Sequence, residues 1–425
     1  MLTLISSAIF SAKQIGLIIR KTVTMRNISI LAANSRYNYG DVLMPIVVNE
    51  YFKQKYHGSY KASFYSYLNR DMSYTGGYSP DSLCNYYSKI EEFDYSIIAG
   101  GQVLSATHSS MLPSEELSNN DHLQNLFDLS FRVVNKVNHY LSESICKKIS
   151  KVNAPTPWII TGCQDKVIYN TVGGNLNNLL SSNKSVFEEC IDNLSKSPYI
   201  SIRSKNDFDF LYKYISCKLV PDSMGIFSQL YPVSKLESLI SDSVFNIIDK
   251  KYFVFQISSP EGLKYTDIII DQIISVCKSL NIGCILLPIG YAAMHDDRVV
   301  LNRIYSKLKS STLDISLLDN LNIWDISYVL AHSNFFIGSS LHGCVISQSY
   351  GVPSSTIITN RPKTLDYLKS WDMSPVPGTL MSDFLSSAKV LSLDSTRRFV
   401  SCSSSSLNSL INDNYRAIES IVFES

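Results

Sequence analysis

The fold of this chain is indicated most clearly by residues 334–346, which read NFFIGSSLHGCVI. An apolar run short enough for a buried strand ends in small residues that permit a sharp turn, and a helix is expected to begin near Leu341. Gly351 and Pro353 are typical of the end of that helix. Strand, turn and helix in this order predict one unit of a parallel α/β layer.

The start of this helix is a candidate anion site. The first amide groups of a helix lack intrahelical partners, and the positive end of the helix dipole favours a phosphate or a carboxylate. His342 lies in the first turn, where a titratable side chain beside a bound anion suits acid/base chemistry on a phosphorylated substrate. The alternative is a histidine that only caps the helix or packs under a loop, and the pattern alone leaves both interpretations open.

Length and composition narrow the class of protein. A chain of 425 residues is too long for one ordinary core, which favours two domains. A hydrophobic fraction of 45% with 18% charged residues is typical of a folded globular protein. The net charge of +1, without basic clusters, argues against nucleic-acid binding. Nine scattered cysteines without a CxxC pair favour reduced thiols in a cytoplasmic protein over a disulfide framework or a zinc site.

Short apolar runs alternate with helical patterns along the chain. This alternation predicts two α/β halves, each winding a parallel sheet, with a cleft between the carboxyl ends of their strands. The predicted strands lie at residues 28–32, 95–98, 158–161, 199–203, 252–257, 283–287, 335–337 and 354–358. The predicted helices lie at residues 41–52, 267–279, 297–308, 324–331, 341–350 and 407–422.

The domain organisation follows from these patterns. We predict a lead-in at 1–27, an N-terminal α/β domain at 28–195, a C-terminal α/β domain at 196–385, and a linker with a final helix at 386–425. The change between halves is expected within residues 183–240, and the serine-rich stretch 401–406 is interpreted as a linker. The lead-in is too interrupted by charge to span a bilayer, but an amphipathic helix there would allow weak peripheral membrane contact.

Polar residues follow two strands of the first half. Asn38 and Asp41 follow the first strand: Asp41 either caps the next helix or, with Asn38, meets sugar hydroxyls in the cleft. Gly100, Gly101 and Gln102 follow a second strand, where glycine lets the backbone approach a ligand closely. A diglycine turn also occurs without any ligand, so this second position remains a hypothesis.

Two further positions carry charge. Arg203 directly follows the strand at 199–203, so its bidentate fork is expected to point toward the cleft, although arginines also end surface strands. Asp222 is expected to cap the short helix that follows it. The sequence His295-Asp296-Asp297 suggests a metal or acid site, but carboxylates equally suit the N-terminus of the following helix, and we expect no metal.

Taken together, these segments resemble the polysaccharide pyruvyl transferase family over about residues 28–366. The resemblance implies a fold similar to GT-B glycosyltransferases, with two Rossmann-like domains facing a cleft. It also implies an enzyme that transfers a pyruvyl group from phosphoenolpyruvate to a sugar and forms a ketal. The sugar would belong to a surface polysaccharide or exopolysaccharide, or to its lipid-linked precursor. We expect such an enzyme in the cytoplasm, at the inner face of the membrane. The residues that carry the resemblance are Asn38-Tyr39-Gly40-Asp41, Gly100-Gly101, Ser201-Ile202-Arg203-Ser204, Pro288 with Asp296-Asp297, Gly338-Ser339-Ser340-Leu341-His342-Gly343 and Gly351-Val352-Pro353.

The resemblance also assigns roles. Arg203 would hold the donor's phosphate or carboxylate, and His342 would be the acid/base. The wider donor site would comprise Gly338, Ser339, Ser340, Leu341 and Gly343, and the acceptor site Asn38, Asp41, Gly100, Gly101 and Gln102. Many relatives carry an arginine two residues before the histidine, where this chain has Ser340. No cofactor is expected beyond the donor substrate.

Two alternatives remain open at this point. One is a glycosyltransferase of the same architecture that uses a nucleotide sugar, because the helix start near His342 would hold a diphosphate equally well. The other is a catalytically silent glycan-binding relative. This alternative remains open because Ser340 stands where many relatives carry an arginine.

Overall fold

The strand, turn and helix expected at residues 334–346 are present as β11 (Phe336–Gly338) and α17 (Leu341–Ser349). They belong to a computed structural model that describes residues 25–115, 129–131, 133–136, 138–245, 250–293, 296–359 and 363–424. Most of the predicted lead-in therefore lies outside the described residues, and so does His295.

The first half winds around a seven-stranded parallel sheet with the order β3-β2-β1-β4-β5-β6-β7. The strand that begins this half, β1, lies inside the sheet, where Ile30 is buried and pairs with Phe64 on one side and with Ile97 on the other. The strands are β1 (Arg26–Leu31), β2 (Tyr60–Ser66), β3 (Asp81–Ser82), β4 (Tyr95–Ile98), β5 (Val167–Val172), β6 (Tyr199–Ile202) and β7 (Lys218–Leu219).

The second half winds around a six-stranded parallel sheet with the order β10-β9-β8-β11-β12-β13. All five side chains of β8 are buried, as expected for a parallel strand covered on both faces. The remaining strands are β8 (Tyr252–Gln256), β9 (Gly283–Leu286), β10 (Ile315–Leu317), β12 (Ser354–Ile357) and β13 (Gly378–Thr379).

Both sheets have the doubly wound order, in which strands are added first on one side of the first strand of each half and then on its other side. Ligands bind where the side changes, outside the carboxyl ends of the strands. The helices that cover the first sheet are α2 (Tyr39–Tyr56), α3 (Leu83–Lys89), α4 (His108–Met111), α6 (His139–Ser150), α7 (Asn177–Ser182), α8 (Lys184–Ser195) and α9 (Lys205–Leu211). Those of the second half are α13 (Ser259–Lys264), α14 (Thr266–Leu280), α15 (Arg298–Leu308), α16 (Ile323–His332), α17, α18 (Lys363–Ser370) and α19 (Phe384–Leu391).

The first sheet extends past the boundary predicted at residue 195. β6 and β7 are its last two strands, so the change between sheets falls between Leu219 and Tyr252, an interval that overlaps the later part of the window 183–240 and extends beyond it. Arg203, at the end of β6, therefore belongs to the first half. The segment between the sheets forms the short helices η5 (Ser223–Ile226), α10 (Phe227–Leu230), α11 (Val233–Leu236) and α12 (Asp242–Phe245).

The strand predicted at residues 158–161 is not formed. Trp158, Ile159 and Ile160 are fully buried but irregular, and the strand of the sheet is β5, a few residues later. The Ile160 amide donates to the Tyr169 hydroxyl at 3.1 Å instead of joining a ladder. The apolar run therefore packs against the sheet as part of the core.

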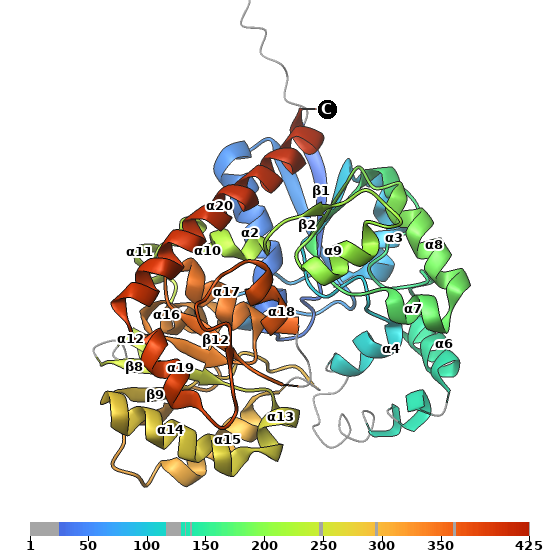
Figure 1. Ribbon diagram of the computed structural model, residues 1–425. Helices are drawn as coiled ribbons and strands as arrows, with labels where there is room; N and C mark the ends of the chain where they lie inside the picture. The colour runs from blue at the N-terminus through green and yellow to red at the C-terminus, as the bar shows by residue number, and fades with distance from the viewer. Residues whose placement is uncertain are drawn as a thin grey trace, which may run out of the picture.

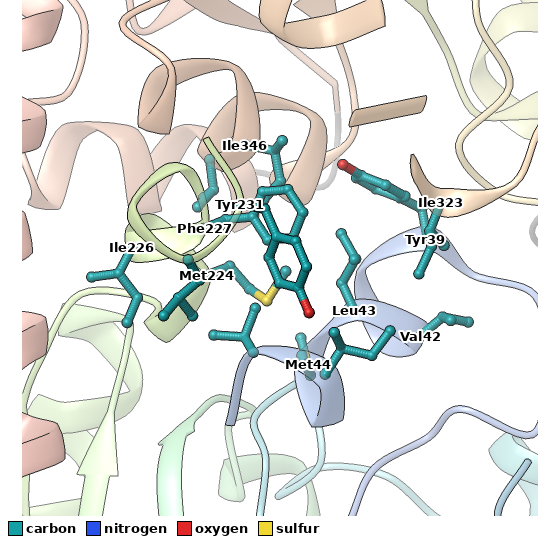
Figure 2. Close-up of a cluster of buried hydrophobic side chains, with 14 of the residues drawn as sticks. Tyr39, Val42, Leu43, Met44, Met224, Ile226, Phe227, Tyr231, Ile323 and Ile346 are labelled. Atoms are coloured by element: carbon teal, nitrogen blue, oxygen red, sulfur yellow. The ribbon is translucent and has the colours of Figure 1, made fainter. Parts of the chain in front are cut away.

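A shared hydrophobic core joins the two halves. Figure 2 shows Tyr39, Val42, Leu43 and Met44 of α2 facing side chains of the connecting segment and of the second half. These partners include Met224, Ile226, Phe227 and Tyr231 from the connection and Ile323 and Ile346 from α16 and α17. This contact holds the carboxyl ends of the two sheets facing each other.

The final helix, α20 (Asp394–Phe423), runs across both halves (Figure 1). Tyr415 stacks on Tyr51 of the first half with ring centroids 4.0 Å apart, while Arg397 donates to the carbonyl of Asn334 in the second half at 3.0 Å. The serine-rich stretch 401–406, expected to be a linker, lies inside this helix. Serine hydroxyls there donate to backbone carbonyls one turn earlier, as Ser405 does to Ser401 at 2.9 Å. The linker prediction, which was based on the serine-rich composition, was therefore wrong.

The cysteines and the longer helices were examined for disulfides and for membrane spans. All nine cysteines are free thiols. Among the described residues, no helix combines the length and the apolar character needed to cross a bilayer.

Candidate active site

A cavity of about 510 Å³ opens between the carboxyl ends of the two sheets. It is lined by residues that follow strands of both halves, as the doubly wound topology requires. The predicted site residues that line it are Asn38, Asp41, Gln102, Arg203, Ser339, Ser340, Leu341 and His342. The structure therefore brings most of the predicted donor and acceptor residues to one cleft.

Arg203, Asp222 and His342 form a buried charged cluster at the base of this cleft. Their exposed fractions are 2%, 1% and 9%. Arg203 Nη1 lies 2.5 Å from Asp222 Oδ2 and 3.3 Å from His342 Nε2, and His342 Nε2 lies 3.6 Å from Asp222 Oδ2. Burial alone would raise the pKa of Asp222, but the Arg203 guanidinium and His342 outweigh it and hold that pKa well below its ordinary value.

Asp222 performs the capping role predicted from the sequence and a second role that was not predicted. Its Oδ1 accepts from the Met224 amide at 3.0 Å and so caps η5. Its Oδ2 is the counter-ion of Arg203. Its own amide donates to the Tyr367 hydroxyl at 2.8 Å, which ties the carboxylate to the second half.

The cluster contains both a donor and an acceptor close to Nε2 of His342. Arg203 can only donate, so its contact is a hydrogen bond when Nε2 of His342 is unprotonated. A proton on Nε2 instead faces the Asp222 carboxylate. Nε2 of His342 therefore has a polar partner in the cluster whether it acts as donor or as acceptor.

Gly40 sets the position of the same ring from the first half. A Cβ atom on residue 40 would lie 1.8 Å from His342 Nδ1 and 2.2 Å from Cγ. Only glycine therefore allows the N-terminus of α2 to approach the ring this closely.

The turn before α17 is organised differently from the simple anion site expected from the sequence. The amides of Ser339 and Ser340 donate to Oε1 of Gln256 at 3.0 and 2.9 Å, and the Ser340 hydroxyl caps the helix by accepting from Gly343 at 3.2 Å. The first-turn amides of Leu341 and His342 have no acceptor within the described part of the chain. An anion bound here would meet those two amides.

Two cations in the cleft were missed by sequence reasoning. Arg36 lies in the loop after β1, donates to Asp41 Oδ2 at 3.2 Å and contacts the Ser114 hydroxyl. Lys363 begins α18. Although Lys363 as a residue is exposed, protein atoms crowd its ammonium group and Arg203 lies near it, which together lower the pKa of Lys363 to about 8.

A signal for these cations was present. Arg36 stands inside the segment that carries Asn38 and Asp41, and Lys363 begins α18, which comes after β12. With Arg203, they place three cationic side chains among the described residues that line the cleft, although residue 340 is a serine.

The four predicted glycines shape the loops and are not among the residues that line the cleft. Gly338 and Gly343 lie against the ring of Phe336, where added Cβ atoms would be 2.4 and 2.5 Å from its Cζ. Gly100 and Gly101 adopt φ values of 130° and 93°, which favour glycine, and they precede Gln102 in the cleft wall.

The side chains of Asp296 and Asp297, suggested together as a metal or acid site, lie in different environments. Asp296 pairs with Arg298 at 2.8 Å, and Asp297 is buried under the turn that carries His342. Among the described residues, no group of three or more histidine, cysteine, aspartate or glutamate side chains is arranged to hold a metal ion.

A family model described as polysaccharide pyruvyl transferase matches residues 38–361, which is most of the chain and includes the cluster. The chain belongs to the polysaccharide pyruvyl transferase family. A search of curated proteins finds no match.

Solved structures similar to this pyruvyl transferase family member include two UDP-GlcNAc 2-epimerases. The enzyme from Methanocaldococcus jannaschii aligns with 91% of this chain and 100% of its own, at 10% identity and a TM-score of 0.52. The enzyme from Neisseria meningitidis bound to UDP-GlcNAc aligns with 94% of this chain and 100% of its own, at 12% identity and a TM-score of 0.53. At this identity the likeness concerns the fold, and it confirms the predicted GT-B-like arrangement of two Rossmann-like domains.

Arg36 lies just before the matched region, and Lys363 lies just after it.

Proposed function

We propose that this chain transfers a pyruvyl group from phosphoenolpyruvate to a sugar of a surface polysaccharide or of its precursor and forms a pyruvate ketal. The observation that carries the proposal is the buried cluster in which Arg203 contacts both Asp222 and His342, at the base of a cleft in a member of the pyruvyl transferase family. The cluster combines an anion-binding fork with a proton carrier.

The cations of the cleft suit a donor with two anionic groups. Phosphoenolpyruvate carries a phosphate and a carboxylate, and guanidinium groups bind both in bidentate fashion. Arg203 and Lys363 border the cleft on the side of the His342 turn, where the amides of Leu341 and His342 add two donors. Arg36 supplies a third cation from the opposite loop and compensates for the serine at position 340.

His342 is proposed to deliver the first proton. Protonation of the methylene carbon of the enol makes the adjacent carbon electrophilic, and a sugar hydroxyl then attacks that carbon. The first hydroxyl returns its proton to His342. The C–O bond to phosphate breaks, and inorganic phosphate leaves with the bonding electron pair and takes up the proton of a second hydroxyl of the same sugar, which closes the ketal. Arg203 and the helix start stabilise the phosphate charge during departure, and Asp222 offsets the charge of a protonated His342.

The acceptor is proposed to bind on the wall formed by the first half. Asn38 and Asp41 are joined by a hydrogen bond of 3.0 Å, and Gln102 lies in the same wall. Amides and carboxylates of this kind bind sugar hydroxyls. The same residues would orient two neighbouring hydroxyls toward the donor carbon.

The test is incubation of the purified chain with phosphoenolpyruvate, or separately with nucleotide sugars, against a panel of glycan acceptors. We expect phosphate release from phosphoenolpyruvate that depends on an acceptor, and loss of that release in His342→Ala. His57→Ala is the matched control, because His57 is exposed at the end of α2, and it should retain wild-type turnover.

Transfer of a whole sugar from a nucleotide donor would replace the proposal with the glycosyltransferase alternative. Glycan binding without consumption of either donor would replace it with the silent relative. Wild-type turnover in His342→Ala would remove that residue from the mechanism.

A further inference from the structure

A buried carboxyl group lies beneath the turn that carries His342, and no basic side chain pairs with it within the described part of the chain. Asp297 is 2% exposed, and the adjacent Arg298 pairs with Asp296 instead. Asp297 Oδ2 accepts three hydrogen bonds, from the amides of Ile289 at 3.1 Å and Gly290 at 2.9 Å and from the side chain of Gln256 at 2.8 Å. A buried oxygen that accepts from three donors holds those donors in fixed positions.

Gln256 links this carboxylate to the turn. Its Nε2 donates to Asp297, which forces Oε1 of the same amide to point the other way. There Oε1 accepts from the amides of Ser339 and Ser340. Gln256 itself is 3% exposed, so both ends of its amide are committed inside the protein.

The same carboxylate reaches the loop that carries Asn38. It holds the amides of Ile289 and Gly290, and this segment bonds to the first half: the Tyr39 amide donates to the Ile289 carbonyl at 3.1 Å, and Asn38 forms a bridge with Gly290. One carboxylate thus connects, through backbone groups, to the proposed acceptor loop on one side and to the His342 turn on the other.

We propose that Asp297 and Gln256 are positioning residues that set the geometry between His342 and the Asn38 loop. They do this by fixing the two backbone segments from which the catalytic histidine and the acceptor-binding residues project. The inference rests on the proposed function for its kinetic consequences, and on the hydrogen-bond network alone for its structural ones.

The test removes the link between the two segments. Gln256→Met removes both ends of the amide without adding charge and should displace the turn. Asp296→Asn, on the same loop but paired with Arg298, is the matched control and should leave the His342 turn in place.

Two readouts are used on the full chain. The first is the NMR signal of the His342 ring in histidine-labelled protein, assigned by its loss in His342→Asn and recorded with and without inorganic phosphate. The second is the separation of kcat from KM in the pyruvyl transfer assay. We expect Gln256→Met to shift the His342 signal and to lower kcat by about 10²-fold, since small displacements of catalytic groups cost this much.

A wild-type His342 signal in folded Gln256→Met would overturn the inference. If Gln256→Met does not fold, Gln256→Glu replaces it and is recorded at about pH 9, above the raised pKa of Asp297, where two charged carboxylates would face each other. A His342 signal that matches the wild type at that pH overturns the inference equally. If no form of the protein turns over phosphoenolpyruvate, the proposed function fails, while the His342 signal still decides the positioning role.

Discussion

The ring of His342 in the second half lies directly against Gly40 in the first, so closely that a Cβ atom on residue 40 would be 1.8 Å from Nδ1 of the ring. The contact joins the start of α2 to the start of α17. It makes the position of the proposed acid dependent on the packing of the two halves.

This contact predicts that Gly40→Ala displaces the histidine. Because the overlap is with ring atoms, we expect a loss of turnover on the order of 10²-fold while the protein remains folded. Turnover and circular dichroism of the variant check the prediction. Lys53→Ala, on the exposed face of the same helix, should behave as wild type. Full activity in Gly40→Ala would show that the position of the ring is not critical.

Asp222→Asn should destabilise the protein strongly. The substitution keeps the shape of the side chain but leaves the guanidinium of Arg203 buried without a counter-ion, at a cost of about 3–5 kcal/mol in the free energy of unfolding. Urea denaturation measures this cost. The control is Asp209→Asn, whose pair with Lys205 is more than half exposed at both side chains and should contribute no more than about 1 kcal/mol. Equal effects of the two substitutions would contradict the assigned role of the buried pair.

Binding of the anionic donor should weaken above pH 8 because of Lys363. Its pKa is lowered to about 8 by the surrounding protein atoms and by Arg203, against the opposing effect of Asp41, Asp222 and Asp207, so the ammonium loses its charge as the pH rises through that value. Loss of one charge close to the donor should reduce affinity on the order of tenfold. Calorimetric titration with phosphoenolpyruvate at about pH 7 and at about pH 9.5 tests this, and Lys363→Arg should remove the decline. Equal affinity of the wild type at the two pH values would exclude Lys363 from the donor site.

Asp297 should make the free energy of unfolding decrease as the pH rises from about 4 to about 7. Burial raises the pKa of its carboxyl to about 7, despite hydrogen bonds from Gly290, Gln256 and Ile289. Between the ordinary pKa and this raised value the folded state holds the proton and the unfolded state does not. The stabilisation is therefore complete below about pH 4 and lost as the pH passes through 7.

Asp297→Asn should flatten this dependence by a few kcal/mol, since each pKa unit corresponds to about 1.4 kcal/mol. Urea denaturation of both proteins across that pH range provides the comparison. Identical slopes for wild type and variant would show that the carboxyl does not hold a proton in the folded state.

Local pattern was sufficient for the parts of the fold in which strand, turn and helix are contiguous. β11 and α17 were predicted within a residue or two, and Arg203 was placed at the end of a strand because the apolar run before it is unambiguous. The same logic failed at residues 158–161, where an equally apolar run packs as irregular core and the more polar run Val167–Val172 forms the strand. Composition does not distinguish these two outcomes, because both bury apolar surface.

The candidate site was accessible from the sequence only in part. His342 and Asp41 were named because each follows a strand, but Gln256 is the last residue of an apolar strand and shows its role only once Ser339 and Asp297 are seen beside it. Lys363 and Gly40 likewise depend on contacts between segments far apart in the chain. Such relations are properties of the packed structure, and no local pattern records them.

The proposed reaction consumes phosphoenolpyruvate and makes a pyruvate ketal. Mass spectrometry of a glycan acceptor after incubation with isotopically labelled phosphoenolpyruvate, with phosphate release followed in parallel, tests this reaction most directly. We expect the acceptor to gain the label with the mass of one pyruvate less one water, and one phosphate to be released per acceptor. His342→Ala should neither label the acceptor nor release phosphate. An acceptor that gains a whole sugar from a nucleotide donor, or that remains unlabelled while bound to the protein, would contradict the proposed reaction.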